Sequence, residues 1–73
     1  MTIGQEIKRI RTKSILSQEA FAKEIGVSFT TVNRWENGKT KPSLKAMRKI
    51  DAYCRDEGMD VNLGQFLMED ETL

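Results

Sequence analysis

The sequence contains no histidine, and it has only one cysteine and one proline among its 73 residues. Without histidine the chain cannot build His-ligated metal sites, Ser-His-Asp triads or Cys-His dyads. The single Cys54 has no partner for an intrachain disulfide, which is typical of proteins from reducing compartments. Paired carboxylates in an apolar setting and glycine-rich phosphate loops are also missing. We therefore expect no metal, no cofactor and no enzymatic activity.

Long hydrophobic runs are missing as well. The apolar share is 38%, and no stretch approaches the roughly 18–20 apolar residues that a membrane-spanning helix needs. Charged residues alternate with isoleucines from Met1 to Lys13, unlike the residues of a signal peptide. We expect a single small domain in the cytoplasm, with no membrane partner and no evident small-molecule ligand.

The net charge is only +1, but the charges are unevenly distributed. All 12 Lys and Arg residues precede residue 56, together with five acids, so residues 1–55 carry +7. Residues 56–73 hold the other six acids and no base. A basic body with an acidic tail is common among proteins that bind nucleic acids.

Apolar spacing and capping residues predict an all-α bundle of four to five short helices. Thr2 and Gln5 form a capping box before a helix over about residues 3–13, and Ser17 caps a second helix that Gly26 ends. Ser28 caps a third helix over about 28–36, which Asn37 and Gly38 terminate. No strand pattern or internal repeat is present, so we expect only helices and tight turns.

The C-terminal half is predicted to add one long and one short helix. Ser43 follows Pro42 as an N-cap, and Gly58 ends the helix. Its apolar stripe is expected to consist of Leu44, Met47, Ile50 and either Tyr53 or Cys54. Leu63, Phe66 and Leu67 fit a short fifth helix in the acidic extension over 59–73.

The junction between the second and third helices carries the functional prediction. Gly26, Val27 and Ser28 leave too short a turn for antiparallel helices, so the helices over 17–36 are expected to form a helix-turn-helix. Val32 and Trp35 lie three residues apart and should face the core. The second helix of such a unit, here 28–36, can enter the major groove of DNA.

The exposed face of that helix holds side chains suited to base recognition. Arginine pairs with guanine, asparagine pairs with adenine, and apolar groups contact the thymine methyl. Phe29 allows two interpretations, an apolar contact to DNA or a prop against the preceding helix. The candidate base-contacting residues are Ser28, Phe29, Thr30, Asn33 and Arg34, with Thr31 at the flank.

Two stretches closely resemble the Cro/C1-type helix-turn-helix family, also called the xenobiotic-response-element family. Residues 16–28 read LSQEAFAKEIGVS and residues 32–42 read VNRWENGKTKP. The resemblance covers about residues 3–57. It implies a lambda-repressor-like domain over 1–58 that binds operator DNA, often as a dimer, and so regulates transcription.

The resemblance also implies contacts to the DNA backbone. Gln18 corresponds to the family's phosphate-contacting glutamine, and the loop from Asn37 to Lys41 corresponds to its backbone-contacting loop. Helix N-termini favour phosphate, and bases beside the third helix suit backbone neutralisation. Ordinary solvated loop charges are the alternative interpretation of the two lysines. The candidate backbone contacts are Gln18, Thr31, Asn37, Lys39 and Lys41.

Three residues have secondary roles in this interpretation. Arg11 and Lys13, at the end of the first helix, are weaker candidates for phosphate contact. Glu36 is expected to be structural and to pair with a nearby base.

Several alternatives stay open at the level of sequence. The apolar residues of 59–73 fit closure of the core, a homodimer seam, or both. Repression and activation are equally compatible with the residues. A protein-interaction module, such as an antitoxin component, is the main alternative to sequence-specific binding of double-stranded DNA.

Overall fold

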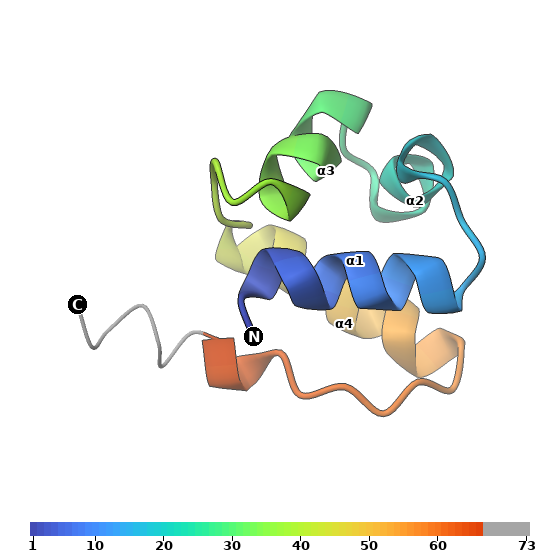
Figure 1. Ribbon diagram of the computed structural model, residues 1–73. Coiled ribbons are helices and arrows are strands. Elements are labelled where there is room, and N and C mark those ends of the chain that lie inside the picture. Colours follow the sequence, from blue (N-terminus) through green and yellow to red (C-terminus); the bar gives the residue numbers. More distant parts are fainter. Residues whose placement is uncertain (67–73) are drawn as a thin grey trace.

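The computed structural model describes residues 1–66 and shows a bundle of helices (Figure 1). The helices are α1 (Ile3–Lys13), α2 (Gln18–Ile25), α3 (Phe29–Glu36) and α4 (Leu44–Asp56), and residues 64–66 are also helical. Figure 1 shows α2 and α3 on one side of α1, with α4 crossing behind it. The predicted all-α, lambda-repressor-like fold is confirmed, and no strand is present within residues 1–66.

Each of the four helices begins where a side-chain cap was predicted. Thr2 and Gln5 form the full capping box of α1, with Gln5 N donating to Thr2 Oγ1 at 3.1 Å. Ser17, Ser28 and Ser43 cap the other helices by accepting a hydrogen bond from the third backbone N–H. Caps of this kind stabilise a helix by about 1 kcal/mol each, because they satisfy N–H groups that have no partner within the helix.

The core is a single cluster formed by all four helices and by the C-terminal segment. The most deeply buried large residues are Ile7, Ile10, Phe21, Val32 and Ile50. Burial of each such side chain stabilises the fold by about 1.5–3 kcal/mol. As predicted, Trp35 is also buried, with 4% of its surface exposed.

One residue of the predicted α4 stripe, Leu44, lies outside the buried face. Leu44 is 52% exposed, whereas Met47, Ile50 and Cys54 are buried as expected and Ala46 joins them. On an α-helix, position 44 lies in the same row as positions 48, 51 and 55, which forms the edge of the buried face. Leu44 therefore lies at the rim of the core rather than inside it.

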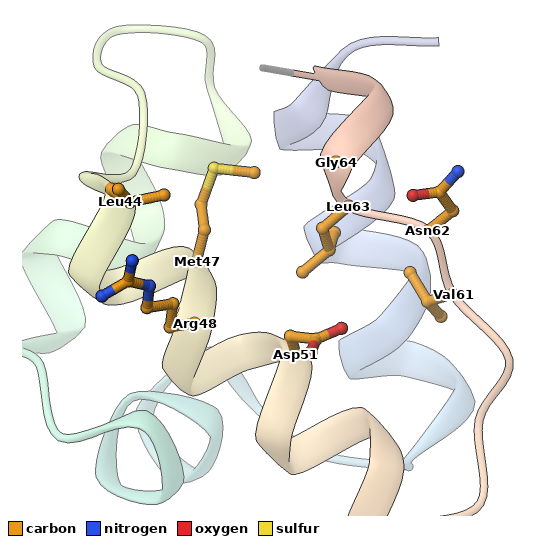
Figure 2. Close-up of a pocket in the computed structure, with 8 residues that line it drawn as sticks. All are labelled: Leu44, Met47, Arg48, Asp51, Val61, Asn62, Leu63 and Gly64. Carbon is orange, nitrogen blue, oxygen red and sulfur yellow. The ribbon is translucent and has the colours of Figure 1, made fainter. Parts of the chain in front are cut away.

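The C-terminal segment closes the core, which decides one of the open alternatives for its apolar residues. Leu63 and Phe66 are each 5% exposed and belong to the core cluster, while Leu67 lies outside the described residues. Figure 2 shows Val61 and Leu63 facing Met47 and Asp51 of α4. A hollow of about 210 Å³ lies between this segment and α4, with Leu44 at its edge.

Candidate nucleic-acid interface

The turn between α2 and α3 has the geometry that a helix-turn-helix requires. Gly26 adopts the left-handed conformation with φ of 85°, and its N–H donates to Ala22 O at 2.8 Å. Val27 N donates to the same carbonyl at 3.0 Å, so the chain leaves the direction of α2 within one residue of the helix end. Ser28 then caps α3 immediately. The two helices pack against each other, and Figure 1 shows them at a steep angle.

The surface of α3 is divided as the sequence predicted. Val32 and Trp35 are buried against the core. Phe29 is 50% exposed, and Thr30 and Arg34 are exposed. Of the candidate base-contacting residues, the structure leaves Phe29, Thr30 and Arg34 of α3 and the N-cap Ser28 exposed, whereas Asn33 is half-buried, and none of them is an acid or a lysine.

The hydroxyl groups of Ser28 and Thr31 form hydrogen bonds at the N-terminal cap of α3. Ser28 Oγ accepts from Thr31 N at 3.1 Å and lies 2.9 Å from Thr31 Oγ1. A hydroxyl has one donor and two acceptor sites, so each retains hydrogen-bonding capacity beyond the cap. Their first role in the free protein is to begin the helix.

A bidentate ion pair lies behind the candidate interface and joins α1 to α3. Arg11 Nε and Nη2 donate to the two carboxylate oxygens of Glu36 at 2.7 and 3.0 Å. Only 13% of the Arg11 side chain and 4% of the Glu36 side chain are exposed. The hydrogen bonds to Glu36 raise the pKa of the Arg11 guanidinium.

This pair confirms one secondary expectation and bears on a second. Glu36 does pair with a base, as predicted, and that base is Arg11. The sequence makes Arg11 a weaker candidate for phosphate contact, whereas in the free protein its guanidinium also donates to Leu16 O at 2.8 Å and holds the fold together. Sequence spacing gave no signal for this pairing, because the two residues lie 25 positions apart.

From Glu36 a row of side-chain amides runs outward along α2 and α3. Gln18 Nε2 donates to Glu36 Oε1 at 3.0 Å. Asn33 Nδ2 donates to Gln18 Oε1 at 3.1 Å, and Asn37 Nδ2 donates to Asn33 Oδ1 at 3.1 Å. The structure thus connects three candidate contacts, two for the DNA backbone and one for a base, through direct hydrogen bonds.

The loop after α3 presents the two candidate lysines beside the same surface. Gly38 N donates to Trp35 O and Lys39 N donates to Arg34 O, which closes the end of α3. Lys39 and Lys41 are exposed. The loop therefore carries positive charge at the C-terminal end of α3.

Within residues 1–66, no group of three or more His, Cys, Asp or Glu side chains could hold a metal ion. None of the helices within residues 1–66 has the length and apolar character of a membrane-spanning segment.

Comparison with known proteins places this architecture in a family. A helix-turn-helix family model matches residues 7–55, a stretch that includes α2, the turn and α3. The chain belongs to the Cro/C1-type helix-turn-helix family. Membership in this helix-turn-helix family supports DNA binding and transcriptional regulation as the class of function.

Curated relatives of this helix-turn-helix protein carry regulator names. An uncharacterized HTH-type transcriptional regulator of Archaeoglobus fulgidus is 36% identical over 92% of this chain and 89% of its own length. Control protein C.MunI of Mycoplasma is 35% identical over 93% of this chain and 86% of its own length. The HTH-type transcriptional activator BcrR of Enterococcus faecalis is 30% identical over 73% of this chain but only 26% of its own length.

The chain spans less than half the length of two of its matched relatives. No solved structure matches the chain.

Proposed function

We propose that this protein regulates transcription by binding a specific double-stranded DNA sequence, with α3 in the major groove. The observation that carries this proposal is the exposed side of α3. An α-helix with its side chains is about 10–12 Å wide, and the major groove is about 12 Å wide. The side of α3 that faces solvent presents a guanidinium, an amide, hydroxyls and one aromatic ring, backed by buried Val32 and Trp35.

Each exposed side chain has a contact that suits its chemistry. Arg34 can donate two hydrogen bonds to guanine O6 and N7, and Asn33 can pair with adenine N6 and N7. Phe29 and the methyl of Thr30 can pack on thymine methyl groups. In this proposal Ser28 contributes its remaining hydroxyl capacity at the start of the helix.

Phosphate contacts would surround this base-contacting face. Gln18 lies at the first residue of α2, where the helix dipole and the backbone N–H groups favour an anion. Thr31, Asn37, Lys39 and Lys41 flank α3 and complete the proposed backbone contacts. Such contacts hold the register of the helix on the duplex and account for much of the affinity.

We also propose that the protein binds as a homodimer. A two-fold symmetric pair of α3 helices would match two half-sites about one turn of DNA apart. Dimerisation would double the number of contacted base pairs, which a domain of this size needs for a unique site.

The test is selection from a random duplex library at about 150 mM salt, followed by titration of the selected site against random DNA. An enriched motif bound about 10³-fold or more tightly than random DNA is expected. Half-sites about 10 base pairs apart would support the dimer. Arg55→Ala is the matched control, because it removes an exposed arginine at the far end of α4 and should leave selection unchanged. A folded protein that enriches no motif would instead support a protein-interaction module.

A further inference from the structure

The hydrogen bonds of the amide row have a fixed direction. In spatial order, the row consists of Arg11, Glu36, Gln18, Asn33 and Asn37. Glu36 accepts from Arg11 on both oxygens, and it also accepts from Gln18 Nε2. Each following amide donates inward through its nitrogen, from Asn33 to Gln18 and from Asn37 to Asn33. Every bond in the row therefore points toward the carboxylate.

The chemistry of the carboxylate explains this order. An ionised carboxylate can only accept hydrogen bonds, whereas an amide has a donor end and an acceptor end that can exchange places by rotation. Gln18 must turn its NH2 group toward Glu36, since its carbonyl would meet another acceptor there. The Gln18 carbonyl then points to Asn33, so Asn33 must turn its own NH2 group inward. The amide orientation of Asn33 thus follows from Glu36, two hydrogen bonds away.

Burial makes the carboxylate a firm anchor for the row. The Glu36 side chain is 4% exposed, and its partner Arg11 is held by the additional hydrogen bond to Leu16 O. Hydrogen bonds to charged groups are stronger than those between neutral groups, and they strengthen further away from water. Asn33 and Asn37, at the outer end of the row, are by contrast partly or fully exposed. The row runs from a rigid buried charge to the proposed DNA-contacting surface.

We propose that Glu36 is a specificity-determining positioning residue, which sets the orientation of the Asn33 amide and so the base that Asn33 accepts. This inference rests on the proposed function. With its orientation set, Asn33 has one N–H and one carbonyl lone pair left, in a fixed order along the groove. The Asn33 N–H can donate to adenine N7, and the Asn33 carbonyl can accept from adenine N6. If the amide were inverted, its N–H would face the N6 amino group and its carbonyl would face N7, and neither hydrogen bond could form.

The decisive variant is Glu36→Gln, which replaces an obligate acceptor by a group that can also donate. Gln18 and Asn33 can then adopt both orientations. Discrimination is measured as the ratio of Kd values for the selected site and for the same site with the Asn33 base pair exchanged. We expect about tenfold discrimination in the wild type and about threefold or less in Glu36→Gln, with discrimination at the Arg34 base pair retained. Wild-type discrimination at both base pairs would overturn the proposal.

The chain offers a closely matched control in Glu6. This carboxylate is also nearly buried and also accepts two hydrogen bonds from one arginine, Arg9, at 2.8 and 2.9 Å. It lies on α1, and no side-chain amide continues from it within the described residues. Glu6→Gln should therefore lose an ion pair of the same bidentate geometry, with a more exposed arginine (42% against 13%), yet keep full discrimination. Equal loss in both variants would mean that general destabilisation, and not amide orientation, is responsible.

A second variant guards against misfolding. Replacing both Arg11 and Glu36 by methionine removes the pair without leaving a buried charge unpaired, a change that proteins often tolerate. This double variant should remain folded by circular dichroism and should show the same loss at the Asn33 base pair. Retained discrimination in the folded double variant would overturn the proposal.

A measurement without DNA separates this inference from the proposed function. In NMR spectra of the free protein, the side-chain NH2 groups of Gln18 and Asn33 should each show one proton that exchanges slowly with water. Glu36→Gln should shift both pairs of signals and speed their exchange, and Glu6→Gln should change neither. Unchanged signals in Glu36→Gln would overturn the inference whatever the DNA result. If the wild type selects no motif, both the proposed function and the specificity role of Glu36 are wrong. The spectra then show independently whether Glu36 sets the orientation of the Gln18 and Asn33 amides.

Discussion

Ile15 provides a test of backbone strain at the end of α1. It has φ of +58°, and the residue is 90% exposed. Ile15 N donates to Thr12 O and Leu16 N donates to Arg11 O, which is the hydrogen-bond pattern of a helix ended by a left-handed residue. Glycine normally occupies this position, because a β-branched side chain crowds the backbone in the left-handed region. We predict that Ile15→Gly stabilises the protein.

The magnitude follows from two opposing terms. The left-handed conformation costs an L-residue about 1–2 kcal/mol, and glycine removes that cost. Glycine also makes the unfolded chain more flexible, which lowers the free energy of unfolding by about 0.4–1 kcal/mol. Since the exposed side chain contributes little burial, the net gain is about 0.5–1 kcal/mol. For a domain of this size such a gain raises Tm by about 2–8 °C.

The assay is thermal and urea unfolding followed by circular dichroism. Gly58→Ala is the paired control, because Gly58 ends α4 with the same hydrogen-bond pattern, φ of +72° and open space around the position of a Cβ. It should lower stability by about 1 kcal/mol through the reverse of the same effect. A lower Tm for Ile15→Gly, while Gly58→Ala behaves as expected, would refute the reasoning and show that the isoleucine side chain has a stabilising contact.

Four further predictions follow from single sites. Arg34→Ala should lose about 1–3 kcal/mol of binding on the selected site and relax preference at one base pair; an equal loss on random DNA would make Arg34 a phosphate contact. Lys39→Ala should weaken binding to all sequences alike and reduce the slope of log K against log salt by about 1, and an unchanged slope would exclude a phosphate contact. Gly4→Ala should destabilise the fold by about 1–3 kcal/mol in urea unfolding, because a Cβ there would collide with the carbonyl oxygen of Trp35; wild-type stability would mean that α1 and α3 can move apart with little loss of stability. A hydrogen bond and ion pair with arginine lower the pKa of Glu6 below its ordinary 4.5, so its contribution to stability is present above that pH and is lost as pH falls through the lowered value. The difference in urea midpoint between the wild type and Glu6→Gln should accordingly shrink on acidification, and a constant difference would contradict the assignment.

Local patterns in the sequence predicted most of the secondary structure. The caps at Thr2, Ser17, Ser28 and Ser43 and the stop at Gly26 all lie where sequence reasoning placed them. These features depend on hydrogen bonds between residues a few positions apart, so the order of residue types carries the information. The same reasoning assigned α3 correctly to a buried side and an exposed side, because helical periodicity alone separates them.

Contacts between distant segments were beyond that reasoning. Leu44 was expected inside the core, but its helical row meets the rim and not the centre of the bundle. The close approach of Gly4 to Trp35 depends on how α1 and α3 pack, and no local sequence pattern around Gly4 predicts it. The left-handed Ile15 was missed for a related reason, since isoleucine ordinarily argues against that conformation.

The candidate interface shows the same division between local and long-range information. The sequence alone determined the all-α fold, the helix-turn-helix and the side chains that α3 exposes, because those properties arise from short-range spacing. Only the tertiary structure brought Arg11 to Glu36 and Glu36 to Gln18, across 25 and 18 positions of the chain. Which donor meets which acceptor depends on the relative placement of three packed helices, and that placement is a property of the whole core.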